Sequence, residues 1–283
     1  MMGDHISSFL KWPGGKRWIA DKLVDALPEI NTYIEPFLGS GAIFFLLAPS
    51  KAYISDINQE LIETYIVMQN YPDELKRKLC YHQKKHSRNY YYKMRSIRPR
   101  TEINRAARFI YLNRTCFNGM YRVNKKGEFN VPIGTKNNCI YDIDLFEKYS
   151  QILKSAVIKC CDFEDAIVLA NNKDLIFADP PYAMESGDNF TKYNDKLFTW
   201  KDQERLLRSL VEARDRGANV VVTNAYCEEI KTMYEKEGFH IYELERVCSI
   251  AGKAEKRKII KEYLITSYLI DGKEENNDEN CNY

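Results

Sequence analysis

The stretch TYIEPFLGSGAIFFLLA, residues 32–48, decides the fold class of this chain. Residues 33–35 predict a short strand, residues 36–41 predict a glycine-containing turn, and the apolar run after them predicts a helix. The segment AYISDIN, residues 52–58, follows at once and predicts a second strand that ends at Asp56. This order of elements predicts an α/β fold with parallel strands.

The same pattern returns after residue 150. Residues 199–217 predict an amphipathic helix that ends at a glycine. Two alternating segments near the end predict an antiparallel hairpin at the edge of the sheet. The strands predicted in this second half are 156–159, 175–178, 219–225, 239–247 and 261–270.

Residues 59–149 differ from both flanks because they are polar, basic and periodic at helical spacing. We therefore expect a discontinuous α/β domain, 1–58 and 150–271, with a largely helical domain, 59–149, inserted in it. The last residues, 272–283, are acidic and rich in Asn, and predict a disordered tail.

Positive charge is concentrated in the inserted segment, although the whole chain has a formal net charge of only +2. Between Cys80 and Lys126 lie thirteen lysines and arginines but one acidic residue, Glu102. Aromatic residues such as Tyr90 and Tyr121 are interleaved with these cations. A polyanion that carries stackable bases would select this combination, so the segment predicts contact with nucleic acid.

The composition argues against several classes of protein. No run approaches the roughly 18 apolar residues of a membrane span, and the first residues lack the features of a signal peptide. The eight cysteines show no CxxC spacing and no regular framework, so we expect neither disulfides nor a metal site. These features predict a soluble cytoplasmic protein without a membrane partner.

The glycine turn lies where an open parallel sheet binds small ligands, beyond the carboxyl end of a strand. Gly39 and Gly41 allow a close approach that a β-carbon would block. A dinucleotide fingerprint would need a third glycine at position 44, which is Phe. Asp56 can accept hydrogen bonds from a ribose diol. These residues predict an adenosine-containing ligand without a pyrophosphate, of which S-adenosylmethionine is the common one.

The upstream turn FLKWPGGKRW, residues 9–18, brings cations and an indole close together. Trp12 is compatible with ordinary core packing and with a place in the ligand site. Lys16 can reach the carboxylate of a bound methionine moiety in a charge-assisted contact.

The segment LIFADPPYAM, residues 175–184, ends a buried strand with an acid, two prolines and a tyrosine. The exocyclic amine of a base is a poor nucleophile because its lone pair is delocalised into the ring. Asp179 and the carbonyl of Pro180 can accept its two N–H hydrogens and aim the lone pair at a methyl group. Tyr182 offers a face on which the base can stack. The segment predicts methyl transfer to the amine of a base flipped out of a duplex.

Five blocks in order, KWPGGK, EPFLGSGA, SDIN, NRTCFNGMYRVNKKGEFNVPIG and ADPPYA, resemble the Dam family of DNA adenine-N6 methyltransferases, the D12 class. The resemblance runs from Phe9 to Tyr268. It implies a Rossmann-like methyltransferase sheet that ends in an antiparallel hairpin, with an inserted DNA-recognition domain. It also implies methyl transfer from S-adenosylmethionine to the N6 amine of adenine in double-stranded DNA.

The resemblance also implies roles for individual residues. Asp162 and Phe163 would border the adenine of the cofactor, and Asp179, Pro180 and Tyr182 would be catalytic. The whole cofactor-binding set implied in this way is Trp12, Lys16, Glu35, Phe37, Gly39, Gly41, Asp56, Asp162, Phe163 and Asp179.

The block NRTCFNGMYRVN, residues 113–124, is similar to the DNA-recognition hairpin of that family. By this similarity Phe117 would be an aromatic wedge beside the vacated base position, and Arg122 would contact a guanine edge. The whole DNA-binding set implied in this way is Arg114, Phe117, Asn118, Met120, Arg122, Lys125 and Lys126.

Family members with this block commonly methylate the adenine of GATC, which is the favoured target here. After NVPIG many members continue with Arg-Tyr, whereas residues 135–138 of this chain are TKNN, so the target sequence stays open. We expect a monomer, since one catalytic site can serve one strand of a palindrome at a time. A cognate restriction endonuclease acting on the same site is an expected partner.

Other functions fit parts of the sequence. An RNA adenine-N6 methyltransferase would share the sheet chemistry, but the hairpin block favours duplex DNA. A protein-glutamine methyltransferase would usually have Asn in place of Asp179. A DNA-binding protein on a decayed scaffold is disfavoured by the intact Gly39, Asp56 and Tyr182, and a nucleotide-binding oxidoreductase by the missing third glycine.

Overall fold

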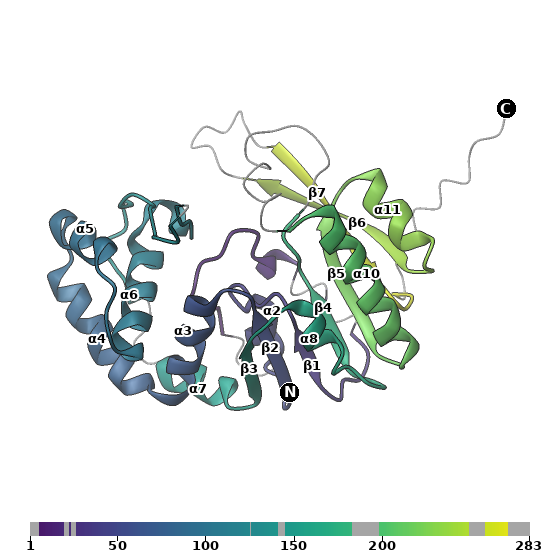
Figure 1. Cartoon of the computed structure of the whole chain (residues 1–283), viewed down its shortest axis with the longest axis horizontal. Helices are drawn as coiled ribbons and strands as arrows, with labels where there is room; N and C mark the ends of the chain where they lie inside the picture. The colour runs from purple at the N-terminus through teal and green to yellow at the C-terminus, as the bar shows by residue number, and fades with distance from the viewer. Residues whose placement is uncertain are drawn as a thin grey trace. The chain divides into compact units, whose positions relative to one another are not determined.

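The computed structural model describes residues 6–19, 23, 27–124, 126–140, 145–182, 198–248 and 258–270. Its strands form a seven-stranded sheet in the order β3-β2-β1-β4-β5-β7-β6 (Figure 1). The chain divides into two compact units. The first is Met1–Asp21 with Leu38–Cys161, and the second is Lys22–Phe37 with Asp162–Tyr283.

The first unit contains two parallel strands, β2 (Ala52–Asp56) and β3 (Ala156–Cys160), which pair in register along their whole length. Helix α2 (Ala42–Leu47) follows the glycine turn and buries the side chains of Ile43, Phe44 and Phe45. The predicted helix after the glycine turn and the predicted strand that ends at Asp56 are both confirmed.

Helices occupy most of the described chain between β2 and β3, as the sequence predicts. Asn58, Ser87 and Thr101 each accept a hydrogen bond from a backbone N–H in the first turn of the helix that follows, so polar caps define where these helices begin. The capped helices are α3 (Gln59–Asn70), α5 (Arg88–Ser96) and α6 (Glu102–Thr115). The same stretch also contains α4 (Pro72–Lys85) and α7 (Leu145–Leu153), and α6 packs against α3, α4 and α5.

The second unit contains the parallel strands β1 (Tyr33–Glu35), β4 (Leu175–Ala178) and β5 (Asn219–Ala225). Every residue of β1 and β4 is buried, as expected for strands covered on both faces. Strand β7 (Lys258–Thr266) runs antiparallel to β5 and pairs with β6 (His240–Cys248). The predicted parallel sheet with an antiparallel hairpin at its edge is confirmed.

Three helices accompany these strands in the described part of the second unit: α8 (Phe163–Ile167), α10 (Trp200–Asp215) and α11 (Glu228–Glu235). The sequence predicts α10, which begins with a capping box formed by Thr199 and Asp202 and packs on β5 (Figure 1). The sequence does not predict α8 and α11, because helices of five and eight residues are too short to show a helical period.

Within the described residues, no helix combines the length and apolar character needed to cross a membrane. The predicted tail, 272–283, lies outside the described residues.

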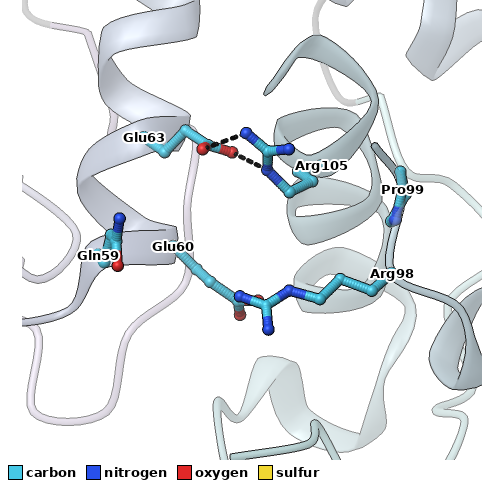
Figure 2. Close-up of a pocket in the computed structure, with 6 residues that line it drawn as sticks. All are labelled: Gln59, Glu60, Glu63, Arg98, Pro99 and Arg105. Atoms are coloured by element: carbon cyan, nitrogen blue, oxygen red, sulfur yellow. Dashed lines mark hydrogen bonds and ion pairs between the residues drawn. The ribbon is translucent and has the colours of Figure 1, made fainter. Parts of the chain in front are cut away.

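An ion pair with two hydrogen bonds joins α6 to α3 in the first unit. Arg105 Nε donates to Glu63 Oε1 at 2.7 Å, and its Nη2 donates to Glu63 Oε2 at 2.6 Å. The pair borders a hollow of about 300 Å³ (Figure 2). Figure 2 also shows the side chains of Arg98 and Glu60 pointing toward one another across this hollow. Planar guanidinium geometry is what allows both oxygens of Glu63 to be engaged at once.

Replacing Arg105 by Lys should lower the free energy of unfolding by about 0.5–1 kcal/mol, because an ammonium cannot make the two parallel hydrogen bonds and the pair is only partly exposed. Urea denaturation measures this. Arg77→Lys is the matched control, since Arg77 makes a single, largely exposed contact of 3.3 Å with Glu74 and should show no measurable change. Equal effects of the two substitutions would contradict a specific role of the α3–α6 pair.

Candidate functional site

Asp56, the last residue of β2, has a carboxylate fixed by backbone groups on two sides. Its Oδ2 accepts from the Gly39 N–H at 3.0 Å, and its Oδ1 accepts from the Asn58 N–H at 2.9 Å. Burial raises the pKa of Asp56, and these backbone hydrogen bonds oppose the rise. Each carboxylate oxygen has two lone-pair sites, so the group can accept further hydrogen bonds from a ligand such as a diol.

Gly39 is required by the close approach of Trp12. Its φ is +47°, and a β-carbon there would lie 2.7 Å from Trp12 Cδ1. Tyr65 donates its hydroxyl to the Gly39 carbonyl at 3.0 Å. Gly41, with φ +63°, precedes the first residue of α2. The structure therefore brings the predicted residues Trp12, Gly39 and Asp56 into one cluster.

The indole of Trp12 also stacks on Tyr121 of residues 113–124, which we call the recognition block. Its ring lies 5.1 Å from that of Tyr121, at an interplanar angle of 20°, and 6.4 Å from that of Phe109. Tyr121 in turn donates its hydroxyl to Glu60 Oε2 at 3.2 Å. Trp12 is therefore packed between the glycine turn and the residues predicted to contact nucleic acid.

Lys16 is buried in the short 3-10 helix η1 (Lys16–Trp18). Its Nζ donates to the Gly14 carbonyl at 3.0 Å, among other contacts. A buried ammonium is costly unless it is paired or hydrogen-bonded. This position fits the predicted role of binding an anionic group.

The segment Asp179–Tyr182, which we call the Asp179 corner, directly follows β4. Asp179 Oδ1 accepts from the hydroxyl of Thr223 at 2.8 Å, and the Tyr182 hydroxyl donates to Glu262 Oε2 at 2.8 Å. Pro180 is buried and Pro181 is exposed. The acid of the corner is thus held by a hydrogen bond to β5, and its ring by a hydrogen bond to β7.

Thr223 and Glu262, which make these bonds, are absent from the set predicted from the sequence. They lie on β5 and β7 and are almost completely buried, with 0% and 2% of their surface exposed. Their position as polar residues within otherwise apolar strands is a sequence signal that could have identified them, since buried polar groups need hydrogen-bond partners. Their partners lie 44 and 80 residues away along the chain, a pairing that no local pattern contains.

The predicted adenine-bordering residues lie in an aromatic and charged cluster of the second unit. Phe163 is buried and stacks on Phe37, with ring centroids 5.4 Å apart. Asp162 caps α8 by accepting from the Glu164 N–H at 3.0 Å and also accepts from Arg205 Nη2 at 3.0 Å. The guanidinium of Arg205 lies 4.8 Å from the ring centre of Phe163.

Glu35, at the end of β1, is also buried. It accepts a hydrogen bond from the Tyr33 hydroxyl at 2.9 Å. Burial, and then the adjacent Glu35 carboxylate, raise the pKa of Tyr33 well above its usual value, so the phenol stays protonated as a donor.

The recognition block forms a short hairpin-like loop after α6. Antiparallel bridges join Cys116 to Ile133 and Val123 to Phe129. Phe117 is 50% exposed, and Asn118 beside it is exposed with φ +54°.

The basic residues of this loop face solvent where the structure describes them. Arg122 is exposed, and its Nε donates to Asn130 Oδ1 at 2.8 Å, which restrains the guanidinium. Lys126 is exposed and Met120 is half-buried. Lys125 lies outside the described residues.

Arg114 is placed differently from the predicted DNA contact. Its side chain is buried, and Nε and Nη2 both donate to the carbonyl of Phe9, at 2.8 and 2.5 Å. Nη1 donates to the Cys139 carbonyl at 3.4 Å. Asn113 makes a reciprocal pair of hydrogen bonds with the backbone of Lys11, at 2.9 and 2.8 Å. The end of α6 therefore holds the N-terminal segment that carries Trp12.

Comparison with known proteins gives a consistent set of relatives. A family model for the D12 class N6 adenine-specific DNA methyltransferases matches residues 12–250. The type II methyltransferase M1.LlaDCHI of Lactococcus lactis subsp. cremoris is 38% identical over 275 residues, which cover 93% of this chain and 96% of that protein. The DNA adenine methylase of Haemophilus influenzae is 32% identical over 265 residues, covering 90% and 92% of the two chains.

Arg114→Lys should lower the free energy of unfolding by about 1.5–3 kcal/mol, because the hydrogen bonds of a buried charged group to the Phe9 carbonyl are lost. Urea denaturation followed by circular dichroism measures this. Arg114→Met, which removes the charge, should leave the slope of the salt dependence of DNA affinity unchanged, since the side chain is buried. Exposed Arg122→Lys is the control and should leave stability within about 0.5 kcal/mol of the native chain. Native-like stability of Arg114→Lys together with a shallower salt slope for Arg114→Met would show that Arg114 contacts phosphate.

Proposed function

Because this chain belongs to the D12 class N6 adenine-specific DNA methyltransferase family, we propose that it moves a methyl group from S-adenosylmethionine to the N6 amine of an adenine flipped out of duplex DNA. DNA adenine methylation and the cofactor follow from the family. The flipped base and the roles of individual residues are the proposal. The main observation in support of this proposal is the Asp179 corner, where the Asp179 carboxylate and the Tyr182 ring are each fixed by a hydrogen bond.

Asp179 and Pro180 would act on the amine. A carboxylate offers about four acceptor sites, so Asp179 can accept an N–H of the adenine amine in addition to the Thr223 hydroxyl. The Pro180 carbonyl accepts the second N–H. These two contacts direct the lone pair of the amine nitrogen out of the adenine ring system and toward the methyl group. Asp179 then takes up the proton that the nitrogen loses on methylation and passes it to water.

The predicted cofactor residues fit an adenosyl ligand by their chemistry. S-adenosylmethionine supplies a methyl group on a positively charged sulfur. The Asp56 carboxylate, held by two backbone N–H groups, suits ribose hydroxyls. Buried Lys16 suits a carboxylate, and the stacked rings of Phe37 and Phe163 offer aromatic surface for an adenine. Trp12, Glu35, Gly39, Gly41 and Asp162 complete the proposed set.

The recognition block would bind the DNA, within a target-recognition domain that we assign to residues 59–149. Phe117 is exposed enough to enter the stack of bases, and Asn118, Arg122 and Lys126 of the same loop are also exposed. We extend the proposal to GATC as the target, to a monomeric enzyme acting at cellular DNA, and to a cognate restriction endonuclease as a partner.

Asp179→Ala should reduce the transfer of labelled methyl from S-adenosylmethionine to duplex DNA by about 10³-fold, because the amine loses its acceptor. Asp215→Ala is the control, since Asp215 is 64% exposed on α10, and it should leave the rate unchanged. Duplex and single-stranded DNA and structured RNA serve as substrates. If the protein binds DNA but transfers no label to any duplex, the proposed methyltransferase activity is refuted. Transfer of label to RNA alone would refute duplex DNA as the substrate.

Arg122→Ala should relax discrimination at one base pair of the target by about 10–100-fold, as expected when a bidentate guanine contact is lost. Lys126→Ala should instead weaken binding to all sequences equally and lower the salt slope by about 1. Sequencing with modification detection, on DNA from cells that express each variant, maps the methylated sites. Unchanged site preference for Arg122→Ala would exclude it as the residue that contacts the guanine.

A further inference from the structure

The hydrogen bond between Tyr182 and Glu262 holds the ring of the Asp179 corner, but the chemistry described above assigns no function to Glu262 itself. Glu262 is 2% exposed, and it lies on β7 opposite Ala225 of β5. An apolar side chain at a buried strand position usually stabilises a protein as well as a hydrogen-bonded acid does, or better. The presence of a carboxylate here therefore calls for an explanation other than stability.

The register of the hairpin places Glu262 beside the residue that holds Asp179. Thr223 is two residues before Ala225 on β5, and side chains two residues apart on a strand share a face of the sheet. Thr223 and Glu262 thus lie on one face, on adjacent strands. One holds the acid of the Asp179 corner and the other holds its ring, both at 2.8 Å.

The orientation of Tyr182 matters because a stacking face is useful only if its plane is fixed. The residue follows two prolines in a turn and is itself half-buried, so packing alone does not surround its ring. A phenol that donates to a carboxylate makes a charge-assisted hydrogen bond, which is about twice as strong as a neutral one. Fixing the ring in advance removes the entropic cost of ordering it when the base arrives.

We propose that Glu262 is a positioning residue, which orients the Tyr182 ring for the flipped adenine and so sets the rate of methyl transfer. The proposal rests on the proposed function. It assigns Glu262 no contact with the cofactor or the base. The defect caused by losing Glu262 should therefore appear in kcat and in the placement of the base, with the KM for S-adenosylmethionine unchanged.

A double-mutant cycle tests this on the full-length enzyme. Glu262→Gln keeps a neutral acceptor and should lower kcat about 3–10-fold, whereas Glu262→Met removes the acceptor and should lower it about 10–100-fold. Tyr182→Phe keeps the stacking ring but removes the donor, and should match Glu262→Met. The double variant Tyr182→Phe with Glu262→Met should be no slower than either single variant, because both remove the same contact.

Two further measurements separate positioning from a structural role. Duplex DNA with 2-aminopurine at the target adenine reports base placement by its fluorescence, which should change for Glu262→Met and for Tyr182→Phe alike. Urea denaturation should show Glu262→Met to be as stable as the native chain or more so. Glu245→Gln, an exposed acid on β6 that contacts Lys261 at 3.3 Å, is the matched control and should have native kinetics.

The outcomes are distinguishable. If the native chain transfers no methyl group to DNA, the proposed function fails and this proposal fails with it. If the native chain is active but Glu262→Gln and Glu262→Met have native kcat, or if the effects of Glu262→Met and Tyr182→Phe multiply, Glu262 does not act through Tyr182. A rise in the KM for S-adenosylmethionine without a change in kcat would likewise overturn the proposal.

Discussion

The carboxylate of Asp56 accepts one hydrogen bond from the glycine turn and one from the start of α3, and much of the first unit depends on these two bonds. They fix the end of β2 relative to Gly39, whose close approach to Trp12 fixes the N-terminal segment in turn. Asn58, which donates to Asp56, is also the cap of α3. A single half-buried acid therefore organises a strand end, a turn and a helix start, and the proposed ribose site is this same group.

The sequence predicts much of the fold because its signals are local. Alternation, apolar runs and glycine stops depend on neighbours within a few residues, and the strands from β1 to β6 and the helix α10 lie where these patterns predict them. Strand β7 is Lys258–Thr266, so it begins three residues and ends four residues earlier than the predicted 261–270. Helices α8 and α11 are missing from that prediction because they are shorter than the window in which a helical period can be recognised. The family resemblance predicted adenine-N6 DNA methylation, which the family match supports.

Side-chain roles were harder to predict where the partner lies far along the chain. Arg114 belongs to a basic segment, and composition does not distinguish an arginine that faces a phosphate from one that donates to the Phe9 carbonyl 105 residues away. Arg108 is similar, since it is buried and donates to the carbonyls of Met94 and Arg95. The count of cations in this segment therefore overstates the number of phosphate contacts that it can make, because some of these arginines hold the protein together.

The stack of Trp12 on Tyr121 has a consequence for protein engineering. Enzymes with new target sequences are often sought by exchanging recognition loops between relatives, which treats the loop as independent of the rest of the molecule. Here the loop residue Tyr121 is bound on one side to the indole that packs on Gly39 and on the other to Glu60 of α3. A transplanted loop would have to bring a ring of matching size at position 121, or bring Trp12 and Glu60 with it, to leave the glycine turn undisturbed.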